Sequence, residues 1–72
     1  MSDVIESRIV TDAAVMGGAP VVEGTRVPVA NVLSEIDAGR SRAEIFRIYP
    51  SLPLDGIEAC IAWARDAAGR RD

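Results

Sequence analysis

The segment 17–29 constrains this chain of 72 residues more than any other stretch. It reads Gly-Gly-Ala-Pro-Val-Val-Glu-Gly-Thr-Arg-Val-Pro-Val. Glycine adopts backbone angles that other residues avoid, while proline fixes φ and removes a hydrogen-bond donor. Glycines and prolines placed this closely predict a shaped turn or ribbon, and the segment carries no group that breaks covalent bonds. The residues expected to set the shape are Gly17, Gly18, Pro20, Gly24, Thr25, Arg26 and Pro28.

The length fits one domain, which we divide into an N-terminal arm with a β segment over 1–28 and a helical part over 29–69. A domain this small buries only roughly 60% of its unfolded surface, so a disulfide, a metal or a second chain usually adds stability. Cys60 is the only cysteine and histidine is absent, which excludes an internal disulfide and an ordinary zinc site. We therefore expect a homodimer or a higher homo-oligomer, with no metal and no cofactor.

Composition also limits the possible activities. The usual general bases are missing because there is neither histidine nor lysine, and Cys60 has no base to activate it. We expect no enzymatic activity and no small-molecule substrate. The net charge of −3 argues mildly against nonspecific nucleic-acid binding, although a local patch can override the total. The sequence shows neither a signal peptide nor an apolar run of membrane-spanning length, so we expect a cytoplasmic protein without membrane contact.

Short β-type runs at 8–11, 15–16 and 21–22 come before the helical part. Gly17 and Gly18 are placed to turn a hairpin between the second and the third of these runs.

Three helices are expected after Pro28, in a mainly α fold. The first runs from Val29 to about Ala38 and carries an amphipathic stripe, with Gly39 at its C-cap. Ser41 and Glu44 form a capping box for the second helix, which continues to about Tyr49. The short link between these helices is typical of a helix-turn-helix. Pro53 suits the first turn of the third helix. The apolar stripe of that helix contains Leu54, Ile57, Cys60, Ile61, Ala64 and Ala68.

Arginines gather at the second helix of the predicted pair. In a helix-turn-helix this helix enters the major groove of DNA, and its first residues reach the bases or a phosphate. Arg42 and Arg47 lie about 140° apart around a helix axis, so they cannot both face one groove wall. DNA contact and simple solvation remain two alternatives. The candidate DNA-binding residues are Arg40, Ser41, Arg42 and Arg47.

Trp63 stands off the main stripe of the third helix and lines up with Ala59 and Ala67. A helix that is apolar on two sides lies deep inside a domain or covers a partner, and both alternatives stay open. The candidate residues for a partner or dimer interface are Val21, Val22, Trp63, Ala67, Arg70 and Arg71. The Gly-Thr-Arg triplet at 24–26 is also open to two interpretations. It is a contact site, or, as we favour, a turn in which Arg26 pairs with Asp12 or Glu23.

The ordered motifs of the chain resemble those of the domain-of-unknown-function family 433 (DUF433) over about Ile9 to Trp63. They are the 17–29 segment, an apolar helix, Ala-Gly-x-Ser-x-x-Glu-Ile and Tyr-Pro-x-Leu. The sequence departs from the family pattern at Ala13, Ala19 and Pro53, and Ala19 removes a positive charge from the loop.

This resemblance implies a homeodomain-like helix-turn-helix fold behind a short β segment. It also implies the antitoxin of a type II toxin–antitoxin pair, which binds a PIN-like ribonuclease toxin and regulates its own promoter through DNA. The alternative is a non-enzymatic interaction or assembly module that uses the helix-turn-helix only as a scaffold.

Overall fold

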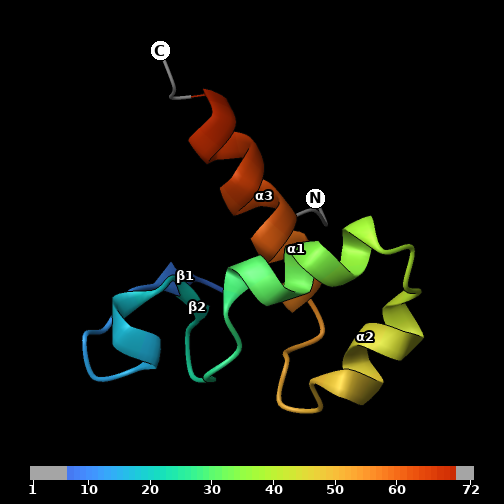
Figure 1. Cartoon of the computed structure of the whole chain (residues 1–72), viewed down its shortest axis with the longest axis horizontal. Coiled ribbons are helices and arrows are strands. Elements are labelled where there is room, and N and C mark those ends of the chain that lie inside the picture. Colours follow the sequence, from blue (N-terminus) through green and yellow to red (C-terminus); the bar gives the residue numbers. More distant parts are fainter. Residues whose placement is uncertain (1–6, 70–72) are drawn as a thin grey trace.

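A computed structural model describes residues 7–69 and shows a mainly helical fold with a short hairpin near its N-terminal end (Figure 1). The strands and the 3-10 turn are β1 (Ile9–Val10), η1 (Met16–Gly18) and β2 (Val21–Val22). The helices are α1 (Val29–Asp37), α2 (Arg42–Ile48) and α3 (Gly56–Gly69). Figure 1 shows the C-terminal half of α3 extending beyond the other elements. No helix within 7–69 is both long and apolar enough to cross a bilayer.

The two strands pair antiparallel, with Ile9 opposite Val22 and Val10 opposite Val21. The predicted hairpin between 15–16 and 21–22 is therefore wrong. The reason is local, because the Asp12 carboxylate accepts a hydrogen bond from the Ala14 amide and the Asp12 carbonyl accepts one from the Val15 amide. These bonds coil the chain back on itself and leave β2 to pair with the earlier run.

The link between α1 and α2 matches the sequence prediction closely. Gly39 has a φ of 85°, in the left-handed region that glycine enters without strain, and its amide bonds the Ile36 carbonyl at the end of α1. The Ser41 hydroxyl accepts a bond from the Glu44 amide at 3.2 Å, and the Ser41 amide donates to the Glu44 carboxylate at 2.9 Å. The capping box is thus confirmed.

The third helix begins at Gly56, later than Pro53 predicted. Pro53 instead lies in the turn before α3, where its carbonyl accepts a bond from the Gly56 amide at 2.9 Å. Leu54 is 84% exposed in this turn, so its placement on the apolar stripe is wrong. Gly56 packs closely on the preceding loop, because a Cβ there would lie only 2.7 Å from Leu52 Cδ1.

The core lies where α1, α3 and the hairpin meet. Cys60 is fully buried in it, and this burial raises the pKa of the thiol to about 11. The N-terminal end of the described chain is tied to the turn before α3, since the Ser7 amide donates to Asp55 at 3.2 Å and the Ser7 hydroxyl donates to the same carboxylate. The side chains of the buried cluster belong to Val22, Val27, Val29, Val32, Ile45, Leu52, Ile57 and Cys60.

Candidate functional site

The candidate DNA-binding residues at α2 are largely engaged within the chain. Arg40 donates to the Glu35 carboxylate at 2.8 Å, and this hydrogen bond, followed by the charge of Glu35, raises the pKa of the Arg40 guanidinium. The Ser41 hydroxyl caps α2. Arg40 is exposed and Glu35 is partly exposed, so their ion pair is of the kind that contributes little to stability and exchanges readily for another anion.

Arg42 connects α2 to α3. Its guanidinium bonds the Glu58 carboxylate and the Leu54 carbonyl, the latter at 3.0 Å, and it lies 5.3 Å from the centre of the Phe46 ring. Three contacts of this kind hold the side chain in place. The sequence offered no sign of this, because Glu58 and Leu54 come from a later part of the chain. Arg42 is therefore engaged with α3 and the turn before it, through an ion pair that is about half exposed.

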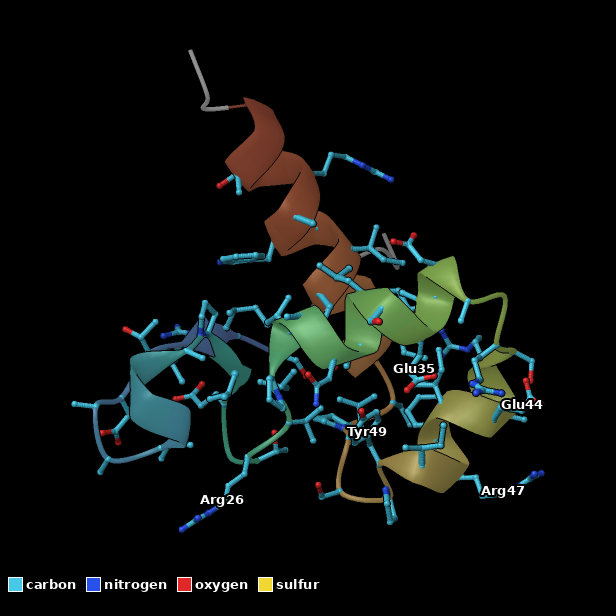
Figure 2. All side chains as sticks on the ribbon, in the orientation of Figure 1. Arg26, Glu35, Glu44, Arg47 and Tyr49 are labelled. Atoms are coloured by element: carbon cyan, nitrogen blue, oxygen red, sulfur yellow. The ribbon has the colours of Figure 1, made fainter. Side chains whose placement is uncertain are left out.

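Arg47 differs from Arg40 and Arg42. It is exposed and forms no ion pair with any residue in the described part of the chain. Figure 2 shows its side chain projecting away from α2 into the surroundings. Of the four candidates, this side chain is the one fully available to an external anion.

The candidate partner residues divide between the interior and the surface. Val21 and Val22 are 2% and 0% exposed, so placing their side chains in an interface is wrong. They are buried because β2 pairs with β1 and packs against the helices. Trp63 is 39% exposed and Ala67 is exposed, both on the extending half of α3. Arg70 and Arg71 lie outside the described residues.

A shallow hollow of about 430 Å³ lies beside Trp63. It joins one face of α3 to the start of β1, so residues from both ends of the described chain form it. Trp63 therefore lines this concave surface and also leaves part of its ring exposed. The lining residues are Ser7, Arg8, Ile9, Ala59, Ala62, Trp63 and Asp66.

The Gly-Thr-Arg triplet forms a tight turn, as the favoured interpretation held. Gly24 has a φ of 83°, and the Thr25 hydroxyl donates to the Val22 carbonyl at 2.7 Å while it accepts from the Val27 amide at 3.0 Å. The other half of that interpretation is wrong. Arg26 forms no ion pair with Asp12, Glu23 or any other residue of 7–69, because its side chain projects away from the turn (Figure 2).

The remaining motif residues shape the backbone around this turn. Gly17 and Gly18 both have positive φ, 66° and 91°, in and after the bend of η1. The Pro20 carbonyl accepts a bond from the Val29 amide at 2.9 Å, and the Pro28 carbonyl accepts from Val32 at 3.3 Å in the first turn of α1. Segment 17–29 therefore holds the start of α1 against the loop that leads into β2.

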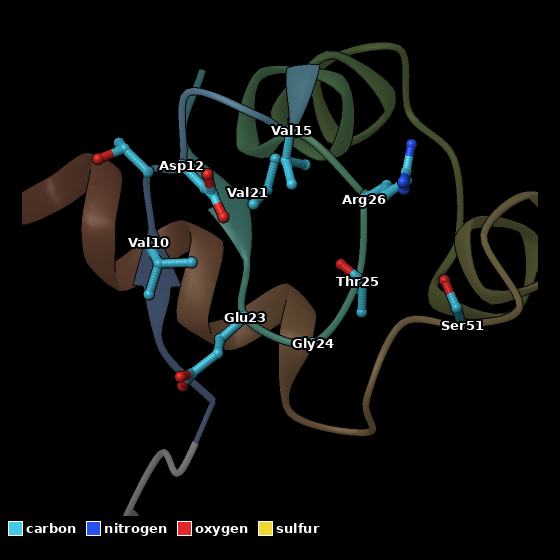
Figure 3. A pocket seen from close by; sticks show the side chains of 10 residues that line it. Val10, Asp12, Val15, Val21, Glu23, Gly24, Thr25, Arg26 and Ser51 are labelled. Atoms are coloured by element: carbon cyan, nitrogen blue, oxygen red, sulfur yellow. The ribbon is translucent and has the colours of Figure 1, made fainter. Parts of the chain in front are cut away.

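A second hollow, of about 750 Å³, opens beside the turn (Figure 3). Its walls come from β1, the loop after β1, β2, the Gly-Thr-Arg turn and the loop before α3. Apolar and charged side chains of both signs line it together. The lining residues are Val10, Thr11, Asp12, Val15, Val21, Glu23, Gly24, Thr25, Arg26 and Ser51. Sequence reasoning missed this hollow because no local signal pairs 9–10 with 21–22.

Within residues 7–69 no group of three or more His, Cys, Asp or Glu side chains is placed to hold a metal ion. The surface of these residues carries exposed arginines, the Trp63 indole, which is 39% exposed with its residue, and the hollows described above.

Comparison with known proteins gives a family but no described activity. The chain is 41% identical over 59 residues to "Uncharacterized protein y4eO" of Sinorhizobium fredii (strain NBRC 101917 / NGR234). That match covers 79% of this chain and 27% of the relative, so the chain spans about a quarter of the length of the relative. No solved structure matches. Residues 9–64 match the family described as "Protein of unknown function (DUF433)", and the chain belongs to this family.

Proposed function

We propose that this chain is the antitoxin of a two-gene toxin–antitoxin module, a non-enzymatic protein that binds and masks a PIN-like ribonuclease. The observation that carries the proposal is the exposure of Trp63 beside a hollow on α3. Tryptophan is among the residues that contribute most to protein interfaces, and its indole here stands on a helix half that extends beyond the body. The resemblance of the ordered motifs to antitoxin-like proteins supports the same role.

The masking surface in this proposal is the α3 face around Trp63 and Ala67, and Arg70 and Arg71, which lie outside the described residues, are its candidate charged groups. The small side chain of Ala67 leaves the indole accessible for insertion into a pocket of the partner. A toxin with an acidic metal site offers the arginines a complementary charge. A domain of this size also gains stability from a second copy, so we propose a homodimer in solution.

Co-expression with the product of the adjacent gene tests the antitoxin role. The neighbour alone is expected to arrest growth, and this chain is expected to restore growth and to co-purify with it. Trp63→Arg is expected to abolish both effects, while the matched surface variant Arg47→Gln keeps them. A neighbour that is harmless alone and does not co-purify removes the antitoxin role.

Autoregulation through DNA forms the second half of the proposal, and Arg47 supports it. Arg40 sits in an exposed ion pair that a phosphate can displace, whereas Arg47 needs no displacement. A gel shift with the DNA upstream of the gene, at two salt concentrations, is expected to show a specific and salt-sensitive complex. Arg47→Gln is expected to weaken it and to reduce the salt dependence by about one unit of slope.

The alternative is an interaction or assembly module in which α2 serves only as scaffold. The contacts of Arg42 with Glu58 and Leu54 favour it, because they commit that arginine to joining helices. The two functions differ in the gel shift. A complete lack of a specific shift, together with co-purification of a partner, leaves the scaffold function.

A further inference from the structure

The hollow beside the Gly-Thr-Arg turn is separate from the α3 face and from α2. Val10 and Val15, both partly exposed, supply its accessible apolar lining, whereas Val21 is 2% exposed and contributes only to the wall behind them. Val10 and Val21 are cross-strand partners, so the hairpin itself fixes their spacing. This part of the hollow is therefore preformed.

The turn that carries the charged rim is held by four hydrogen bonds. The Thr25 amide bonds the Val22 carbonyl at 3.0 Å, and the Val22 amide bonds the Val27 carbonyl at 3.1 Å. The other two are the bonds of the Thr25 hydroxyl, which donates to the Val22 carbonyl and accepts from the Val27 amide. The backbone at Arg26 is accordingly fixed, so a ligand that binds the guanidinium costs the conformational entropy of that side chain only.

Glu23 and Arg26 stand on opposite arms of this turn. They differ in charge and are close in sequence, yet they form no ion pair, and Figure 3 shows their side chains pointing away from each other. Both are exposed and neither forms an ion pair elsewhere within 7–69. The hollow thus presents Arg26 at one end and Glu23 at the other, and between them it holds both the valines and the exposed Asp12 carboxylate.

We infer that this hollow binds an extended peptide segment of a partner protein, with a carboxylate at Arg26, an apolar side chain on the valines and a basic side chain at Glu23. Alternate residues of an extended strand share one face, which places such side chains at i, i+2 and i+4 over about 14 Å. The site stands on its own geometry and does not depend on the antitoxin role.

A peptide fits this hollow better than a small molecule or a nucleic acid. Asp12, Glu23, Arg26 and Ser51 are all exposed, so the hollow is too open to enclose a small molecule as ligand pockets do. The carboxylates of Asp12 and Glu23 repel a phosphate backbone. An extended peptide can carry both of the charges that complement Arg26 and Glu23.

The test is an NMR titration of the isotope-labelled protein with the capped peptide Asp-Ser-Val-Ser-Lys and with the same peptide in reverse order. One of the two is expected to shift the amide signals of Val10, Val21, Gly24 and Arg26, with a dissociation constant on the order of 1 mM. Arg26→Gln is expected to weaken binding about two- to fivefold, the effect of losing one partly exposed charge pair. Glu23→Gln is expected to remove the preference for lysine.

Two controls make the result decisive. Arg47→Gln changes the net charge by the same amount at a distant surface and is expected to leave the affinity unchanged. The neutral peptide Asn-Ser-Val-Ser-Gln is expected to produce no shifts. Equal shifts with the neutral peptide, or unchanged affinity in Arg26→Gln, overturn the inference. Shifts of the same residues by a DNA duplex that disappear in Arg26→Gln reassign the hollow to nucleic acid.

Discussion

Thr25→Val is the substitution that most directly tests how the Gly-Thr-Arg turn is held. Valine keeps the branched shape of threonine, so the change removes the hydroxyl and little else. The hydroxyl donates to the Val22 carbonyl at 2.7 Å and accepts from the Val27 amide at 3.0 Å. The two lost bonds have unequal consequences. The Val22 carbonyl keeps the bond from the Thr25 amide, whereas the Val27 amide loses the acceptor that it has in the described part of the chain.

The expected cost follows from this asymmetry. A buried amide left without an acceptor costs about 1–3 kcal/mol. The Val22 carbonyl keeps another donor, so the loss of its second bond adds at most about a few tenths of a kcal/mol. The new methyl group offsets part of the cost, since a fully buried one contributes about 0.8 kcal/mol. We expect a net loss of about 1–2 kcal/mol in the free energy of unfolding. For a domain of this size, that corresponds to a fall in melting temperature of roughly 5–15 °C.

Urea and thermal unfolding followed by circular dichroism measure this loss. Thr25→Ser keeps the hydroxyl and is expected to retain most of the stability. Thr11→Val makes the same chemical change at an exposed position and is expected to stay within about 0.5 kcal/mol of the wild type. The reasoning is refuted if Thr25→Val is as stable as the wild type, or if Thr25→Ser loses as much as Thr25→Val.

Three further predictions concern the helices. Ser41→Ala removes the acceptor of the capping box and is expected to cost about 1 kcal/mol in urea unfolding, with Glu44→Gln costing less because the amide oxygen still accepts. Ile45→Ala empties a buried site and is expected to cost about 2–5 kcal/mol, so an unfolding midpoint near that of the wild type contradicts the described core. The pKa of the Cys60 thiol, raised by burial from its ordinary value of 9.0 to about 11, makes the folded state favour the protonated thiol. The stability that this protonated thiol contributes is therefore complete below pH 9 and is lost as the pH rises toward 11. Over this interval the free energy of unfolding is expected to fall more steeply for the wild type than for Cys60→Ala, by up to about 1.4 kcal/mol per pH unit.

Local signals predicted the first two helices well. Gly39 ends α1 through its left-handed backbone, and Ser41 with Glu44 starts α2. Both boundaries are therefore determined by residues that lie next to them in sequence. The start of α3 was misplaced because Pro53 suits the first turn of a helix and also the turn before one. The close approach of Gly56 to Leu52 depends on packing that a sequence pattern does not encode.

The surfaces were harder to predict because they depend on distant contacts. Nothing near Val21 and Val22 in the sequence indicates that they are buried, because the strand that pairs with them comes earlier in the chain. Arg42 was grouped with the other arginines of α2, although Glu58 of α3 holds it. For Trp63 the local signal left burial and a partner contact open, and the structure finds the residue 39% exposed.

The bond between Ser7 and Asp55 has a consequence for how the protein is made. It joins residues 48 positions apart, and β1 packs against α3, so the first strand depends on the last helix. On the ribosome the N-terminal strand emerges long before its helical support is synthesised. Because contacts between distant residues form late and must overcome the entropy of closing the chain between them, the nascent strand stays unsupported until α3 has left the exit tunnel. The hairpin is therefore expected to become stably packed only after the residues of α3 have been synthesised.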